Sequence, residues 1–174
     1  MDYDPKIRKP AGVSVHLDLL SSFNQSQPQD KREHVSSHNA KPHGVTRING
    51  AVPPGIEAPA VITLLLRGSL GPGLELHQYR TVRQPGTRAP IHTHPYGGST
   101  CMIKGESTVR IEGEAQPHTI KPGECFLMPG GPAMVNFNSG NIPFEAIDTF
   151  VLKKGEKPIK VLEPGRTHVF ELDL

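Results

Sequence analysis

The chemistry open to this chain is indicated most clearly by His92 and His94, two histidines separated by one residue. Successive side chains of a β-strand point to opposite faces, so residues i and i+2 share a face. Two neutral imidazoles on one face can bind a single transition-metal ion such as zinc, iron, nickel or copper. An isolated His-x-His pair is a weak signal, and its value depends on the segments around it.

Turn-forming residues frame this pair and recur in a second block further along the chain. The arrangement resembles the two motifs of the cupin superfamily, G-x5-H-x-H-x3-4-E-x6-G and G-x5-P-x-G-x2-H-x3-N. The matching residues are Gly86, His92, His94, Gly105, Gly123, Pro129, Gly131 and Asn138. The resemblance covers roughly residues 60–152. It implies an all-β fold, an antiparallel β-barrel of six or more strands (the double-stranded β-helix jelly roll), whose interior holds the functional site. It also implies a homodimer, because cupins often pair by strand exchange or sheet packing.

Two of the four metal ligands that the resemblance implies are replaced in this chain. Gly98 stands where the family has a glutamate, and Met134 stands where it has a third histidine. Glycine offers no ligand atom, and a thioether suits Cu(I) but binds hard and borderline ions poorly. Zinc normally takes at least three protein ligands, so two imidazoles alone make a weak site.

His92 and His94 therefore have three interpretations. In the first, a replacement ligand comes from another strand, with His77, Tyr79 and Asp148 as candidates. In the second, the metal keeps open positions that substrate or water fills. In the third, the metal is lost and the imidazoles act as acid/base groups or hydrogen-bond donors, since their pKa lies near neutrality. We favour a metal, one divalent ion of Fe, Zn, Ni, Mn or Cu.

Further side chains are expected to face the same interior and form a substrate pocket. If the family register holds, the period of two places Gly98, Thr100, Met102, Met134 and Asn136 there. Tyr96 precedes two glycines and is expected at the barrel mouth, where its phenol can bind a ligand and take part in catalysis. Cys101 should point away from the pocket, and Cys125 should be a buried small hydrophobe.

The elements that must position these residues are short strands joined by turns. The chain holds 18 Gly and 18 Pro but only 5% aromatic residues, without a repeat or a low-complexity period. Apolar stretches of strand length alternate with Gly/Pro turns from residue 48 onward, which predicts an antiparallel sandwich or barrel. The expected strands are 61–66, 74–82, 102–103, 108–111, 125–128, 135–137 and 144–152, with a further candidate at 168–172.

The sequence divides into three segments. Residues 1–47 form an N-terminal arm, 48–155 the cupin barrel and 156–174 a C-terminal extension. The stretch 21–43 is polar and nearly free of large apolar side chains. We expect it to pack on the barrel, to clasp the partner of a homodimer, or to be partly disordered.

Composition and motifs exclude several classes of function. A net charge of +2 without a Lys/Arg block gives no reason to expect a nucleic-acid partner. No apolar run approaches the roughly 20 residues of a membrane span, and the first residues lack the pattern of a secretory leader. Phosphate-binding loops and a GxSxG elbow are absent from the sequence, so no nucleotide cofactor is expected. Two cysteines are too few for a disulfide framework, which favours a reducing, cytoplasmic location.

These observations predict a small-molecule enzyme of the metallocupin type. The metal on His92 and His94 would polarise or orient a substrate oxygen, in oxygenase, isomerase or lyase chemistry. One alternative is a metal-free cupin that binds or senses a small ligand. Another is a metal-free epimerase or cyclase that uses one of the two histidines as acid or base. The fold by itself does not decide among them.

Overall fold

The computed structural model of the chain describes residues 44–166, where all twelve regular elements are β-strands. Most of the expected N-terminal arm and the candidate strand at 168–172 lie outside the described residues. Across residues 44–166 there is no helix long and apolar enough to span a membrane.

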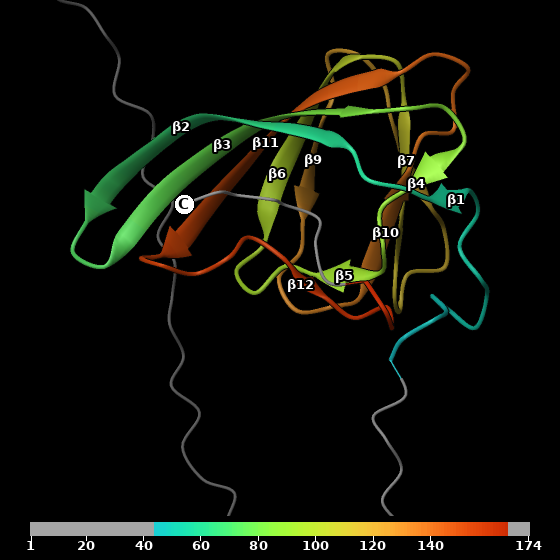
Figure 1. Cartoon of the computed structure of the whole chain (residues 1–174), viewed down its shortest axis with the longest axis horizontal. Helices are drawn as coiled ribbons and strands as arrows, with labels where there is room; N and C mark the ends of the chain where they lie inside the picture. Colours follow the sequence, from blue (N-terminus) through green and yellow to red (C-terminus); the bar gives the residue numbers. More distant parts are fainter. Residues whose placement is uncertain (1–43, 167–174) are drawn as a thin grey trace, which may run out of the picture. The chain divides into compact units, whose positions relative to one another are not determined.

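The first of two sheets has five strands in the order β2–β3–β11–β6–β9, and all its neighbours are antiparallel (Figure 1). Its strands are β2 (Val61–Gly71), β3 (Leu74–Arg83), β6 (Gly98–Lys104), β9 (Cys125–Met128) and β11 (Phe144–Lys153). The long strands β2, β3 and β11 lie side by side, and β2 forms one edge of the sheet.

The second sheet follows the path β1–β4–β10–β5–β12, with β7 paired to both β10 and β8. Its strands are β1 (Ile56–Glu57), β4 (Thr87–Arg88), β5 (His92–Thr93), β7 (Ser107–Ile111), β8 (His118–Ile120), β10 (Met134–Phe137) and β12 (Lys160–Val161). Only β1 and β4 pair in parallel among these strands of the described region. The antiparallel architecture predicted from the turn spacing is confirmed.

The hydrophobic core lies between the two sheets, because both contribute side chains to one cluster. Strand β3 illustrates the pattern, since its odd-numbered residues from 75 to 83 are buried and the intervening ones are more exposed. The core cluster consists of Tyr79, Met102, Val109, Ile111, Ile120, Met128, Met134, Phe144, Ala146, Phe150 and Leu152. Ile48, Ile91 and Val135 form a second, smaller cluster.

Each strand expected between residues 61 and 152 is present, and β2 and β6 are longer than expected. The first expected strand, 61–66, extends to Gly71 as β2, because the hairpin pairing with β3 continues to Gly71 and Leu74. The two- and three-residue strands were not predicted. One of them, β12, belongs to the C-terminal extension and pairs with β5 through Val161 and His92.

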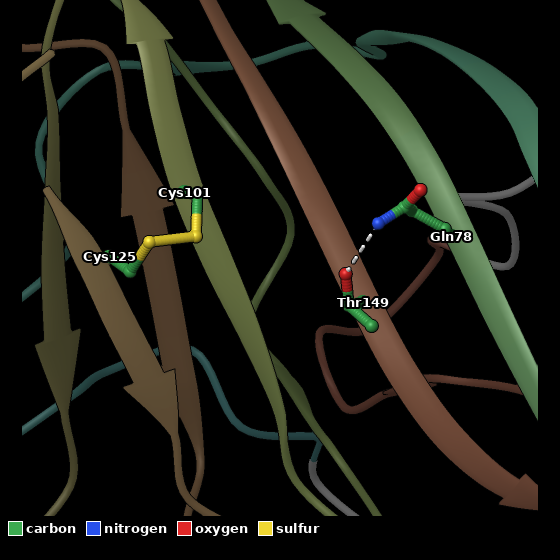
Figure 2. The surroundings of a disulfide bond; sticks show 4 residues. All are labelled: Gln78, Cys101, Cys125 and Thr149. Carbon is green, nitrogen blue, oxygen red and sulfur yellow. Dashed lines mark hydrogen bonds between the residues drawn. A yellow bond between two sulfur atoms is a disulfide. The ribbon is translucent and has the colours of Figure 1, made fainter. Parts of the chain in front are cut away.

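Cys101 and Cys125 form a disulfide bond between β6 and β9 (Figure 2). The register places the two residues directly opposite each other, with their Cα atoms 4.0 Å apart. The backbone of Met102, the residue after Cys101, makes the ladder hydrogen bonds: its N–H donates to Glu124 and its carbonyl oxygen accepts from Gly123. The cysteines therefore occupy a non-hydrogen-bonded pair, in which opposite residues lie closest together. The expectation of a buried, unpaired Cys125 was wrong, because this residue is exposed on an edge strand. The argument for a reducing compartment therefore loses its basis.

Candidate functional site

A cavity of about 60 Å³ lies between the two sheets and has room for a few water molecules or a compact ligand. Its polar lining consists of Thr81, Arg83, His92, His94, Thr100, Ser107, Asn136 and Asp148. Its apolar lining consists of Ile62, Ala89, Met102, Val109, Met128, Met134, Phe144, Phe150 and Ile159. Both sheets contribute lining residues, so the cavity forms only when the two sheets pack against each other.

In both histidines the same ring nitrogen, Nε2, carries the electron pair that can bind a ligand. Nδ1 of His92 donates a hydrogen bond to the carbonyl oxygen of Pro90 at 2.8 Å, and Nδ1 of His94 donates to that of Pro158 at 3.0 Å. A carbonyl only accepts, so in both rings Nδ1 carries the hydrogen and Nε2 carries the lone pair. Histidine ligands of metals are commonly held in this way.

His94 is the more constrained of the pair. It is 2% exposed, and its Nε2 is buried without a hydrogen-bond partner among the described residues. The two rings are perpendicular, with centroids 4.9 Å apart. Leaving such a nitrogen buried and unpaired costs about 1–3 kcal/mol, which a ligand bound to it would recover.

Burial keeps both imidazoles uncharged at neutral pH. It is the main cause that lowers the pKa of His92 to about 3, with His94 and Arg83 adding repulsion. Burial also lowers the pKa of His94. A neutral imidazole with an accessible lone pair can bind a metal ion or accept a proton.

A metal ion of the usual cupin type would find the right nitrogen atoms here but too few ligands. Across residues 44–166 no group of three or more His, Cys, Asp or Glu side chains is placed to hold a metal. An ideal Cβ on Gly98 would lie 2.5 Å from the ring of Phe150, so this ring fills the place of the family's glutamate. Met134 lines the cavity directly opposite His92 in the ladder between β10 and β5. The residues present therefore offer a metal two imidazole nitrogens, and the only further donor that the pairing places beside His92 within residues 44–166 is the thioether of Met134.

An acid and a cation share the cavity with the histidines. Burial raises the pKa of Asp148, although its carboxylate accepts a hydrogen bond from the Thr81 hydroxyl at 2.6 Å and another from Thr100. Arg83 is buried and donates from Nη1 to the carbonyl oxygen of Ala58 at 2.8 Å. Burial lowers the Arg83 pKa to about 10, which leaves the guanidinium charged at neutral pH. Its Nε has no partner among the described residues.

The predicted site residues divide into two groups. His92, His94, Thr100, Met102, Met134, Asn136 and Asp148 all line the cavity. His77 and Tyr79 share the buried face of β3 but lie further along the strand, outside the lining. His77 donates from Nε2 to Glu75 at 3.1 Å, and its Nδ1 shares a 3.0 Å hydrogen bond with the Tyr79 hydroxyl. These two residues therefore form a network of their own and supply no ligand next to His94.

Tyr96 and Gly98 also lie outside the cavity lining. The Tyr96 ring is exposed and has the ammonium group of Lys153 5.6 Å from its centroid, so its partner is a surface cation. The missing side chain of Gly98 makes room for Phe150 and not for a substrate. In the cavity lining, Phe150 therefore stands in front of Gly98.

Sequence reasoning missed several lining residues, of which Arg83, Thr81 and Phe150 matter most. The first two share a face with His77 and Tyr79 at the period of two, so extending the alternation along 74–83 would have found them. Phe150 follows Asp148 at the same period. Its contact with His94, at 5.3 Å between ring centroids, depends on pairing across the sheet and has no local signal.

No family model and no curated protein matches this sequence. Solved structures do match. A cupin-like protein from Thermotoga maritima has a TM-score of 0.50 and 19% identity, over 59% of this chain and 74% of that one. The DMSP lyase DddQ from Ruegeria pomeroyi has a TM-score of 0.51 and 22% identity, over 63% of this chain and 54% of the lyase, about half of its length. Such identities establish a likeness of fold, and the fold that this chain shares with these structures is the double-stranded β-helix of cupins.

Proposed function

We propose that this protein is an enzyme of the metallocupin type that acts on a small polar molecule. His92 and His94 would hold one transition-metal ion through their Nε2 atoms. The observation that carries the proposal is the Nε2 of His94, which is buried without a partner among the described residues and belongs to a side chain that lines the cavity. Both rings already have the tautomer that a metal requires, and both are uncharged at neutral pH, so neither has to move or lose a proton within its ring before it binds.

The chain's own polar groups define what the substrate must be. When bound, the metal would supply Lewis-acid polarisation or orientation of a substrate oxygen. Arg83 would hold a negatively charged or carbonyl oxygen, because its cation is buried and its Nε is free of partners among the described residues. Asp148 would give or take a proton, since its raised pKa brings it nearer to neutrality. The apolar remainder of the lining would exclude water from the reacting groups.

The volume of the cavity limits the substrate to a compact molecule. The likeness to a DMSP lyase supports an enzyme, but at 22% identity the lyase's substrate is not carried over. Oxygenase, isomerase and lyase chemistry all remain compatible with an oxygen-binding metal beside a cation and an acid.

Element-resolved metal analysis of untagged protein tests this proposal. We expect near-stoichiometric transition metal in the wild type and its loss in His92→Ala and in His94→Ala. His118→Ala is the matched control, because this histidine is exposed and lies outside the cavity. A wild-type protein that stays empty after reconstitution with each candidate metal would reject the proposal.

A metal-free function is the second candidate, and the shortage of acidic, histidine and cysteine ligands within residues 44–166 favours it. In this case the cavity binds a small ligand, with His92 or Asp148 serving as acid or base if turnover occurs. Turnover, or a ligand-induced rise in melting temperature, would then survive a chelator. Asp148→Asn would abolish turnover without changing the metal content.

We further infer that the protein forms a homodimer through the free edge of β2. Within the described residues no strand pairs with the other edge of β2. The strand carries the exposed apolar residues Val61, Leu64, Leu65, Leu66 and Leu70. A long apolar edge of this kind is a template for pairing with another strand. Antiparallel pairing about a two-fold axis would bring the same run of a second copy against it.

A further inference from the structure

We propose that the thioether sulfur of Met134 is the third ligand of the metal on His92 and His94, and that the site therefore selects copper(I). This inference rests on the proposed function only in assigning a metal to the two histidines. Beyond that function, copper(I) is the ion, and Met134 is the residue that makes the site prefer it to divalent ions.

The sheet pairing places Met134 beside His92. The two residues are direct partners across the antiparallel strands β10 and β5. The Cβ atoms of directly opposite residues lie about 4.5–5.5 Å apart, and their side chains project to the same face. Both residues are buried, and both line the cavity with His94. The unbranched, flexible methionine side chain can bring its sulfur to an ion held by the neighbouring imidazole.

The donor set suits a soft ion. Two imidazole nitrogens and a thioether sulfur are ligands that copper(I) accepts, whereas magnesium, calcium and manganese prefer carboxylates, carbonyls and water. The ring of Phe150 closes the position from which a carboxylate at residue 98 would reach the ion. Asp148 is already engaged by the hydroxyl groups of Thr81 and Thr100.

The charge of the ion argues in the same direction. Both histidines are neutral ligands, and the lining holds one acid, Asp148, beside one cation, Arg83. The cost of burying an ion rises with its charge. A monovalent ion adds half the charge of a divalent one, so burying copper(I) costs less.

The other two methionines of the lining belong to the opposite sheet. Met102 lies in β6 opposite Ala146, and Met128 lies in β9 opposite Gly98. Neither is the direct partner of a histidine, which makes Met102 a matched control for the loss of a buried thioether.

The test is an anaerobic titration of the metal-free full chain with copper(I) against a chromophoric copper(I) chelator. A parallel titration uses zinc(II) and a zinc chelator. Met134→Leu conserves side-chain volume and should keep the fold. We expect it to weaken copper(I) binding about tenfold or more and to leave zinc(II) binding nearly unchanged. Met102→Leu should leave both affinities at the wild-type value.

A second variant keeps the test decisive if Met134→Leu does not fold. Met134→His supplies a third imidazole in place of the sulfur, and we expect it to raise the affinity for zinc(II) and reduce the preference for copper(I). X-ray absorption of the copper(I)-loaded wild type should show a sulfur neighbour that is absent from the Met134 variants.

The outcomes separate the two proposals. If Met134→Leu binds copper(I) as tightly as the wild type, or if copper shows no sulfur neighbour, Met134 is not a ligand. The metallocupin proposal then still stands, provided that His92→Ala loses its metal. If neither copper(I) nor any of the other candidate metals binds in a manner that depends on His92, both proposals fall.

Discussion

The ring of Phe150 occupies the space that a side chain at position 98 would need. An ideal Cβ on Gly98 would lie 2.5 Å from Cδ1 of Phe150 and 2.9 Å from the backbone oxygen of Thr149. The same ring stacks on His94, with 5.3 Å between the centroids. The position at which the cupin motif has a glutamate is thus closed by a residue of another strand, and His94 is packed against an aromatic ring in place of a carboxylate.

Gly98→Ala should lower the free energy of unfolding by about 1–3 kcal/mol, because the added methyl group overpacks against the ring. Phe150→Leu relieves the ring contact but not the contact with Thr149, so the double variant should be more stable than the sum of the single effects predicts. Urea unfolding of the four proteins measures this coupling. Gly68→Ala is the control, since a Cβ there meets nothing within 4 Å. Strictly additive effects of the two changes would contradict the packing argument.

The ion pair between Arg88 and Glu163 should contribute far more to stability than the pair between Arg80 and Glu145. Glu163 accepts two bonds from the guanidinium, at 2.7 and 2.8 Å, and a third from the backbone N–H of Ile91 at 2.9 Å. The side chains of this pair are 10% and 15% exposed, against 42% and 28% for the other.

We therefore expect Glu163→Gln to cost about 3 kcal/mol, because it leaves a mostly buried cation without its counter-charge. Glu145→Gln should cost much less, since water screens an exposed pair. Chemical denaturation of the two variants ranks them. The reverse order would show that burial does not control the strength of these pairs.

Reduction of the Cys101–Cys125 disulfide should destabilise the protein by about 3 kcal/mol, the chain-entropy value for a crosslink over a sequence separation of 24. A thiol reductant should lower the melting temperature of the wild type. A Cys101→Ser/Cys125→Ser double variant should melt at a lower temperature than the oxidised wild type. The reductant should not change the melting temperature of this variant. Equal melting temperatures of the oxidised wild type and the double variant would contradict this prediction.

Acid should destabilise the metal-free protein through His92. Its pKa falls from an ordinary 6.5 to about 3 on folding, mainly through burial. Between those values the unfolded chain binds a proton that the folded chain does not, so stability falls as the pH drops below 6.5. The wild type should lose roughly 3 kcal/mol more than His92→Gln between pH 7 and pH 4.

Urea midpoints across that pH range, measured on chelator-treated protein, check the His92 prediction. Parallel pH profiles for the wild type and His92→Gln would show that this imidazole is not the group responsible.

Leu65→Lys should convert a homodimer into a monomer. Leu65 is exposed in the edge strand β2, between the paired residues Leu64 and Leu66. A charge at this point opposes strand-to-strand association. Size-exclusion chromatography with light scattering measures the mass of both proteins. A wild type that elutes as a monomer would remove the dimer proposal without affecting the metal site.

The positions of the main strands could be predicted because they rest on local signals. Gly and Pro turns bound each apolar stretch, and the period of two assigns Thr100, Met102 and Asn136 to one side of their strands, where all three line the cavity. The expectation for Cys125 rested on residue type and failed, because a disulfide depends on the register between β6 and β9, which is set by pairing and not by composition.

By itself, the sequence determined the strand order along the chain and the presence of two imidazoles on one side of a strand, since both follow from near-neighbour spacing. Only the tertiary structure decided which nitrogen each imidazole exposes, because Pro158 reaches His94 from a distant segment. It also decided that Phe150 closes the position beside Gly98 and that Met134 lies opposite His92. These relationships join residues far apart in the chain, and they exist only once packing between the sheets has set the register of every strand.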